Sequence, residues 1–120
     1  MSHKDTGNRA ELLASRFLEQ RGLQPLHKNF HCRRGEIDLI MRNRDSLVFI
    51  EVRYRRNKHY GGAAGSVTQT KCRRIAQCAR YYLDRYQASE QSIRFDVIAI
   101  EGTGNELQIE WLKDAFRPEA

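Results

Sequence analysis

Two apolar-rich segments, separated by a short polar turn, most strongly constrain the fold of this 120-residue chain, and both carry acids at alternate positions. The segments, Glu36–Arg42 and Leu47–Arg53, flank the turn 43–46 and predict a β-hairpin. The apolar face of this hairpin pairs Ile37 with Val52, Leu39 with Ile50, and Met41 with Val48. The other face pairs Asp38 with Glu51, and Glu36 with Arg53. A slip of one residue would move the apolar side chains off their face, so the register is well specified.

The opposed carboxylates of Asp38 and Glu51 need an explanation, because like charges directly opposite each other destabilise a sheet. A bound divalent cation would remove that cost, and carboxylate oxygens are the ligands that Mg²⁺ and Mn²⁺ prefer. Ile40 and Phe49 lie on the same face, which indicates a partly covered cleft. The alternative is a surface hairpin with solvated acids and a simple Glu36–Arg53 ion pair.

Length and charge limit the class of protein. We expect one domain over residues 1–120, because the chain is too short for two. The formal net charge of +6 favours an anionic partner, and nucleic acid is the leading candidate. A membrane surface is disfavoured, since the basic residues are scattered among acids and no segment is long and apolar enough to span.

The N-terminus has no apolar signal segment, so we expect a cytoplasmic protein. The three cysteines, Cys32, Cys72 and Cys78, are odd in number and form no CxxC motif. We interpret them as small, buried or half-buried side chains of a protein in a reducing compartment.

The remaining periodicity predicts two helices and three further strands. A first helix is expected from about Arg9 to Arg21, and Gly22 ends it. The segment 24–32 is a weaker strand, placed at or near a sheet edge by Pro25. The segments 93–101 and 107–112 predict a strand inside the sheet and a last strand.

A basic, glycine-rich connection, 55–65, precedes the second helix, which is expected to begin near Val67. Ser66 and Gln69 have the spacing of a capping box at its start. The resulting order is helix, three strands, helix, two strands. It predicts an α/β protein with a mixed sheet and helices packed on it.

Several segments together resemble a known group of nucleases. Gly35-Glu-Ile-Asp38, followed by Phe49-Ile-Glu-Val-Arg53, is similar to the PD-(D/E)xK signature. The whole chain more narrowly resembles the bacterial YraN family, uncharacterised proteins similar to archaeal Holliday-junction resolvases. Besides the two hairpin strands, the resemblance rests on Glu11, Tyr60-Gly-Gly-Ala63, Ser66-Val-Thr-x-x-Lys71 and Arg94-Phe-Asp-Val97. It implies a restriction-endonuclease-like fold, so that residues 1–120 form one endonuclease-like domain.

The resemblance also implies roles for individual residues. Asp38 and Glu51 match the metal ligands, with Mg²⁺ or Mn²⁺ as the expected cofactor. Glu11 matches the acid that the first helix contributes in resolvase-like nucleases. The alternative for Glu11 is a capping role, because Asn8 and Glu11 are spaced like a helix N-terminal pair.

Arg53 departs from the signature, which has lysine there. A guanidinium stays charged, so Arg53 can bind phosphate or position water but cannot act as a general base. Lys71 can supply an ammonium group instead if the start of the second helix faces the acids. The candidate catalytic set is therefore Glu11, Asp38, Glu51, Arg53 and Lys71.

Basic residues around the glycine-rich connection predict contact with a nucleic-acid backbone, DNA in preference to RNA. The predicted contact residues are Arg53, Arg55, Arg56, Lys58, Gln69, Lys71 and Arg74. The alternative for each single residue is an ordinary solvated surface position.

Two functions follow from the resemblance. The first is a metal-dependent endodeoxyribonuclease or resolvase, a phosphodiester hydrolase that acts on structured DNA. The second is a nucleic-acid-binding protein on the same fold with weak or lost cleavage. The resemblance also predicts a homodimer, for which Trp111, Leu112 and Phe116 offer apolar surface, although these three side chains could equally cover the sheet.

Overall fold

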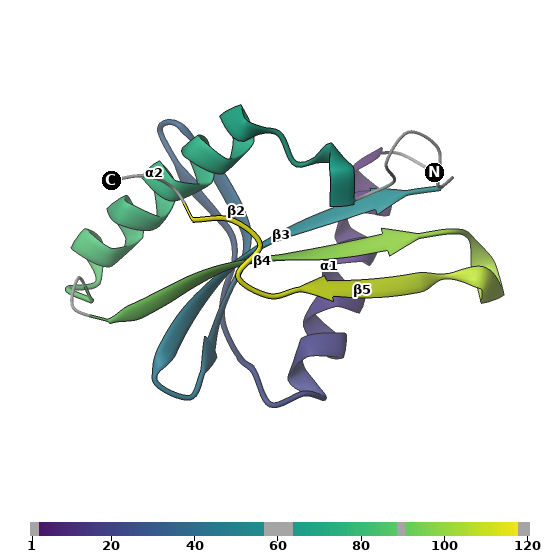
Figure 1. The fold of residues 1–120 in the computed structure, drawn as a ribbon, viewed down its shortest axis with the longest axis horizontal. Helices are drawn as coiled ribbons and strands as arrows, with labels where there is room; N and C mark the ends of the chain where they lie inside the picture. The colour runs from purple at the N-terminus through teal and green to yellow at the C-terminus, as the bar shows by residue number, and fades with distance from the viewer. Residues whose placement is uncertain (1–2, 57–63, 89–90, 118–120) are drawn as a thin grey trace.

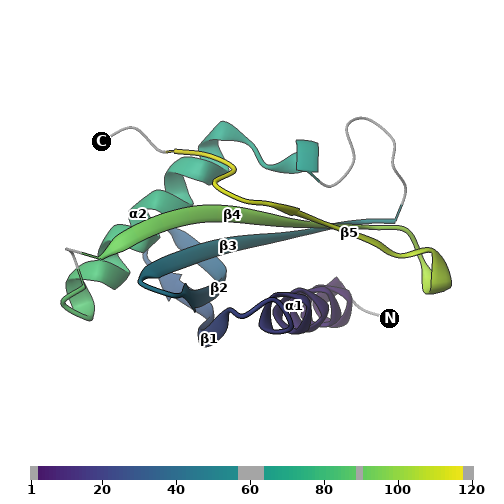
Figure 2. The same cartoon turned by 60° about the horizontal axis from the view of Figure 1, so that its bottom comes forward.

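The fold is a five-stranded sheet with one long helix on each side (Figures 1 and 2). The computed structural model describes residues 3–56, 64–88 and 91–117. Its elements are α1 (His3–Glu19), β1 (Gln24–Cys32), β2 (Gly35–Asn43), β3 (Ser46–Arg55), the short 3₁₀ helix η1 (Ala64–Ser66), α2 (Gln69–Arg85), β4 (Ser92–Glu101), the 3₁₀ helix η2 (Gly104–Glu106) and β5 (Gln108–Leu112).

The strands lie in the order β1-β2-β3-β4-β5, so chain order and spatial order agree. β3 and β4 are parallel, and the other neighbouring pairs are antiparallel. Because parallel strands need a long crossover, α2 lies between β3 and β4 in the chain. The predicted α/β class and element order are confirmed, as are the edge position of 24–32 and the inside position of 93–101.

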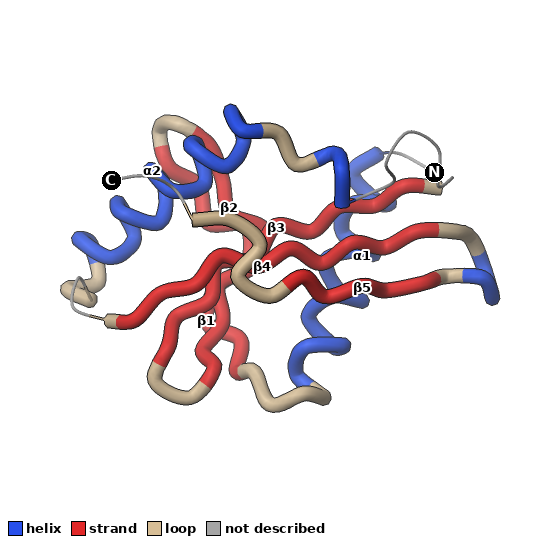
Figure 3. Tube along the Cα trace, in the orientation of Figure 1, coloured by secondary structure: helices blue, strands red, loops and turns tan. Residues whose placement is uncertain are grey.

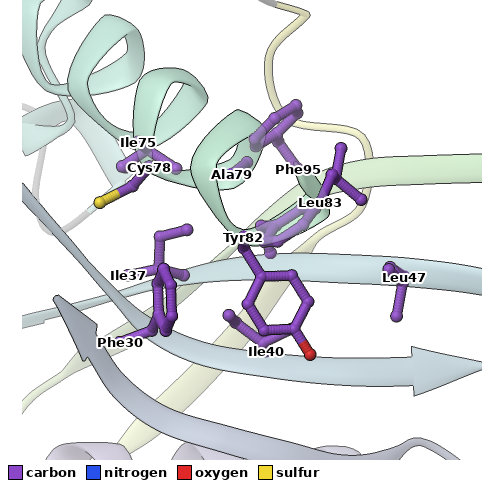
Figure 4. Close-up of a cluster of buried hydrophobic side chains, with 11 residues drawn as sticks. Phe30, Ile37, Ile40, Leu47, Ile75, Cys78, Ala79, Tyr82, Leu83 and Phe95 are labelled. Carbon is purple, nitrogen blue, oxygen red and sulfur yellow. The ribbon is translucent and has the colours of Figure 1, made fainter. Parts of the chain in front are cut away.

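The two faces of the sheet have separate hydrophobic clusters. α1 covers one face, where Ala14 and Leu18 pack on side chains that come from every second position of the central strands. α2 covers the other face, and Figure 4 shows Ile75, Ala79 and Tyr82 of this helix packed above the strands. The strand residues under α1 include Leu39, Met41, Val48, Ile50, Ile98 and Ile100. Those under α2 include Ile37, Ile40, Leu47, Phe49 and Phe95.

The hairpin register is confirmed as far as Leu39 opposite Ile50, and it ends there. Beyond this pair β2 and β3 diverge, as the tube in Figure 3 shows. The Val52 N–H donates to Asp38 Oδ2 at 2.8 Å, so a side chain takes the position of a ladder bond. The predicted pairing of Ile37 with Val52 is therefore wrong: Ile37 packs under α2, whereas Val52 packs on the α1 side.

The first helix begins earlier than predicted, and the second begins near the predicted place but with a different cap. α1 begins at His3, so Asn8 lies inside the helix and the capping alternative for Glu11 is wrong. The helical start at His3 was not predicted because Gly7 lies within the first turns, and glycine is a poor helix former. α2 begins after Thr68, whose hydroxyl accepts the Lys71 N–H at 3.1 Å. The predicted Ser66–Gln69 capping box is therefore also wrong.

The C-terminal segment folds back over the sheet. The Phe116 ring stacks on Phe95, with centroids 5.1 Å apart. Trp111 packs edge-on against Phe17 of α1 and donates its Nε1–H to the buried Asp96 at 2.9 Å. Trp111 and Phe116 thus cover the sheet, and the homodimer stays a prediction.

A disulfide joins Cys32, at the end of β1, to Cys78 of α2, with Cα atoms 5.6 Å apart. All three cysteines are buried or half-buried as expected, but the disulfide contradicts the expectation of reduced thiols for Cys32 and Cys78, whereas Cys72 is free. Spacing along the sequence does not reveal a pair that only the tertiary structure brings together. Within the described residues, no helix has the length and apolar character to cross a membrane.

Candidate active site

The predicted pair of acids lies where β2 and β3 separate. Asp38 is 7 % exposed and Glu51 is 3 % exposed, and a hydrogen bond links their carboxyl groups. Glu51 lies two residues after Phe49 on β3, so both side chains point to the same face of the sheet. Phe49 packs under α2, and Glu51 therefore projects toward α2. Asp38 is held by the Val52 N–H, so its carboxyl lies beside the edge of β3. The alternative of two solvated surface acids is wrong.

Two cations lie beside Glu51 and are more exposed than the acids. Lys71 Nζ is 3.1 Å from Glu51 Oε1, and Arg53 Nη1 is 3.8 Å from the same oxygen. Arg53 Nε also donates to Ser66 Oγ at 2.7 Å, which fixes the guanidinium plane. The Lys71 side chain is 39 % exposed and that of Arg53 is 25 % exposed. The start of α2 therefore does face the acids, as the role considered for Lys71 requires.

Burial makes the negative charge on these carboxyl groups costly. Burial, reinforced by the nearby Asp38, raises the pKa of Glu51 to about 8 despite the opposing effect of Lys71. Burial also raises the pKa of Asp38, against the hydrogen bond from Val52 and the one shared with Glu51. Near neutral pH and without a cation, the pair therefore retains a proton. A ligand that supplies positive charge would favour the ionised form.

Glu11 approaches the pair from the other side of the sheet. It lies on α1, and its carboxyl group is within hydrogen-bond reach of Asp38 and of the Asn29 side chain. Burial and the negative charge of Asp38 raise the pKa of Glu11 to about 7. Asn29 has a left-handed backbone (φ 50°), which asparagine tolerates better than most residues. Asp38 is thus flanked by one acid from each side of the sheet.

The donor set fits a hard divalent cation held by two carboxylates. Mg²⁺ is commonly bound through one or two carboxylates, with water and substrate phosphates as the remaining ligands. Asp38 and Glu51 supply that number, and their proton retention indicates an environment that favours added positive charge. In the part of the chain that the structure describes, no three His, Cys, Asp or Glu side chains are grouped to hold an ion. A ligand role for Glu11 therefore stays a prediction.

The Glu36–Arg53 ion pair considered from the sequence does not form. Glu36 Oε2 instead lies 3.4 Å from His31 Nδ1, whereas Arg53 contacts Glu51 and Ser66. The divergence of β2 from β3 explains the difference, because position 36 is no longer opposite position 53.

The exposed residues predicted to contact nucleic acid lie on two parts of the structure, the end of β3 and the first half of α2. Arg55 and Arg56 are exposed at the far end of β3, beyond Arg53. Gln69 and Arg74 are exposed on α2, on either side of Lys71. A Cβ at Gly35 would meet the Arg74 Cβ at 3.4 Å, so the turn between β1 and β2 lies against α2 here. Lys58 lies outside the described residues.

Three contributors to the site escaped the sequence analysis: Ser66, Asn29 and the backbone N–H of Val52. Ser66 and Asn29 give no chemical signal in the sequence, because serine and asparagine are common in turns and caps. The role of the Val52 N–H depends on the divergence of β2 from β3, which strand alternation does not predict.

Comparison with known proteins identifies the family. The family model described as "Uncharacterised protein family UPF0102" matches residues 10–100. This chain belongs to the UPF0102 family. A UPF0102 protein of Nitrosococcus oceani is 48 % identical over 99 % of this chain and 97 % of its own length. The UPF0102 protein YraN of Escherichia fergusonii is 49 % identical over 97 % of this chain and 87 % of its own.

A UPF0102 protein of Aeromonas hydrophila is 50 % identical over 92 % of this chain and 83 % of its own length. The predicted membership of the YraN family is therefore confirmed. The matched UPF0102 region begins just before Glu11 and ends within β4, so it contains both hairpin acids, Arg53 and Lys71.

Proposed function

We propose that this chain is a metal-dependent endodeoxyribonuclease that hydrolyses a phosphodiester bond of structured DNA. The observation that carries the proposal is the pair Asp38 and Glu51. Both are buried, lie in hydrogen-bond contact, have raised pKa values and are adjacent to the Lys71 ammonium group. Buried like charges are costly unless a ligand compensates them, and such arrangements are typical of functional sites.

Asp38 and Glu51 would hold Mg²⁺ or Mn²⁺. When bound, the ion would polarise the phosphate and lower the pKa of a coordinated water. Asp38 is oriented by the Val52 N–H, and Glu51 by Lys71, so the carboxyl groups are positioned before any ligand arrives. Glu11 would tune the charge of Asp38 from the α1 side.

The two cations would serve the phosphate. Arg53 is held by Ser66, and its remaining guanidinium donors suit a phosphate oxygen. It cannot accept a proton from water, because a guanidinium remains charged. Lys71, whose ammonium group lies next to Glu51, would take the role of the lysine that the PD-(D/E)xK signature supplies from the strand. It would donate hydrogen bonds to the developing charge on the phosphate.

The DNA backbone would follow the exposed cations around this centre. Arg55 and Arg56 extend from one side along β3, and Gln69 and Arg74 flank Lys71 on α2. The net charge of +6 favours such contact, and phosphate contacts of this kind depend strongly on salt. The preference for DNA over RNA rests on the resemblance to resolvases.

The first experiment measures Mn²⁺ binding and DNA nicking in the same variants. Asp38→Asn and Glu51→Gln should abolish both Mn²⁺ binding by calorimetry and cleavage of flapped, four-way and linear DNA. Asp45→Asn and Glu110→Gln are matched controls, because both acids are exposed and lie away from the pair. Mn²⁺ affinity that survives Glu51→Gln would exclude the proposed site.

A second candidate function is nucleic-acid binding without cleavage. It is favoured by Arg53 in place of the signature lysine and by the Lys71–Glu51 contact, which partly satisfies the acid without metal. Salt-dependent DNA binding with no metal-dependent nicking on any of the three substrates would support this alternative. DNA affinity that does not fall steeply between low and moderate salt would contradict both functions.

A further inference from the structure

A basic cavity separate from the acids lies between the turn joining β1 to β2 and the middle of α2. It has a volume of about 600 Å³. Its basic lining residues are His31, Arg33, Arg34 and Arg80, and its acidic lining residue is Asp84. Arg33, Arg34 and Arg80 are exposed and have no ion-pair partner within the described part of the chain. The cavity therefore presents three arginine charges against the single carboxylate of Asp84.

An exposed aromatic ring forms part of the same cavity. Tyr81 is 50 % exposed, although its ring lies 6.0 Å from that of the buried Phe30. One face of the ring is thus supported by β1 while much of its surface remains open. Aromatic rings beside a basic groove are the usual stacking platforms for unpaired bases.

The walls of the cavity are linked covalently. Cys32 lines it and is bonded to Cys78 of α2, so the turn that carries Arg33 and Arg34 is tied to the helix that carries Arg80. This link restricts the distance between the guanidinium groups before a ligand binds. A preorganised set of donors loses less conformational entropy on binding.

The cavity lies along α2 from the proposed catalytic centre. Lys71 and Arg80 are on the same helix, separated by roughly 14 Å along its axis at about 1.5 Å per residue, and they project from opposite sides of it because nine residues make two and a half turns. A fully stacked strand covers that axial distance in about four nucleotides at roughly 3.4 Å each, and an extended strand covers it in fewer. Arg74 lies between them, against the turn at Gly35. A strand held at Lys71 would therefore reach the cavity through Arg74.

We propose that this cavity binds the phosphates of an unpaired DNA strand, a few nucleotides from the scissile phosphate, and that Tyr81 stacks on one of its bases. The inference rests on the proposed function and defines its substrate class. The preferred DNA carries a single-stranded arm, as a flap does, in contrast to a fully paired duplex.

The test is fluorescence anisotropy of labelled single-stranded, flapped and blunt DNA with the intact protein in EDTA, so that cleavage cannot contribute. Tyr81→Ala should weaken single-strand binding by about tenfold, and Tyr81→Phe should retain it. Tyr86→Ala is the matched control, because this exposed tyrosine of α2 packs against Tyr82 outside the cavity. The wild type should prefer flapped over blunt DNA, and Tyr81→Ala should lose that preference.

The arginines are tested through the salt dependence of the same binding. Arg33→Gln combined with Arg34→Gln should reduce the slope of log affinity against log salt by about 1.4, at roughly 0.7 per phosphate contact on a single strand. Arg16→Gln combined with Arg44→Gln is the control, because both residues are exposed away from α2.

The outcomes separate the two proposals. If the cavity variants match the wild type while Arg55→Gln and Arg74→Gln weaken binding, the cavity proposal is overturned and the proposed function stands. If the cavity variants weaken binding but the wild type never nicks DNA with Mn²⁺, the cavity stands and the nuclease fails. If the wild type binds no DNA, both fail.

Discussion

Lys71 Nζ lies 3.1 Å from Glu51 Oε1, which brings the start of α2 onto the acid of β3. Only the fold creates this contact, since the two residues are separated by the glycine-rich connection and η1. An ammonium group beside Glu51 is thus supplied from a helix, while the strand position two residues after Glu51 holds Arg53.

Replacing Lys71 by methionine should lower DNA nicking by about a hundredfold, because a donor directed at the phosphate is lost. Lys71→Arg keeps the positive charge and should restore part of the rate. Rates are measured at saturating Mn²⁺ on the best of the three DNA substrates. Lys28→Met, at an exposed position of β1, is the control and should match the wild type. An unchanged rate in Lys71→Met would remove this residue from the site.

Replacing Arg53 by lysine should raise nicking if the arginine weakens the site. The lysine would restore the signature and would release Ser66 Oγ, which now accepts from Arg53 Nε. Arg55→Lys is the matched control, because Arg55 lies two residues further along β3 and is exposed. A fall in nicking would mean that the bidentate guanidinium is needed for phosphate binding, and would assign Arg53 a positive role.

Without metal, the protein should lose stability as pH rises from about 5 to 8. In the unfolded chain Glu51 loses its proton near 4.5, whereas in the folded protein it retains it to about 8. The folded state therefore binds more protons across this window, so its stabilisation is complete below 4.5 and is lost as pH rises through 8. The expected decline in unfolding free energy from this group is roughly 1 kcal/mol per pH unit.

Urea denaturation in EDTA at several pH values measures this decline. Glu51→Gln should reduce it, most clearly above pH 7, where the raised pKa of Glu11 no longer contributes, while Glu110→Gln should leave it as in the wild type. Added Mn²⁺ should oppose the decline above pH 7, because the ion binds the ionised carboxylates of the folded state. A stability that rises across the window in EDTA would contradict the raised pKa of Glu51.

Asp96 should be essential for stability. It is fully buried and accepts hydrogen bonds from Arg94 Nε and Nη2, Trp111 Nε1 and the Asp114 N–H, all at 2.9 Å. Asp96→Ala leaves the Arg94 charge without its partner and should lower the free energy of unfolding by roughly 3–5 kcal/mol. Thermal and urea denaturation measure the loss. Asp45→Asn, at an exposed turn position, should be nearly neutral.

Strand patterning predicted the centre of the sheet correctly. Leu39 faces Ile50 and Met41 faces Val48 as expected, because alternation fixes a register wherever one face is buried. The same reasoning failed at Ile37. There the Asp38 side chain takes a backbone N–H of β3, and the alternation of β2 changes. The acids were found by their types and spacing, whereas the strand divergence that brings them together was not.

Helix boundaries and the cysteine pair were harder to predict. A capping signal at Ser66 was present, but the fold uses that hydroxyl for Arg53 and caps α2 with Thr68. Both residues are good caps, so the sequence does not distinguish them. Cys32 and Cys78 are 46 residues apart, and nothing local marks them as partners. Asp96 lay within a segment of the family resemblance, yet its buried hydrogen-bond network required the position of β5.

The hydrogen bond from the Val52 amide to Asp38 means that this aspartate has a structural role as well as a place in the acidic pair. It ends the pairing of two strands, and it contributes to the acidic pair. Under the proposed function, a related protein that had lost catalysis would still need the aspartate to end the β2–β3 pairing at this point. The partners of Glu51 within the described residues are all side chains, so the course of the backbone does not depend on this glutamate. Under the proposed function, the glutamate is therefore the more informative indicator of catalysis in other chains of this architecture.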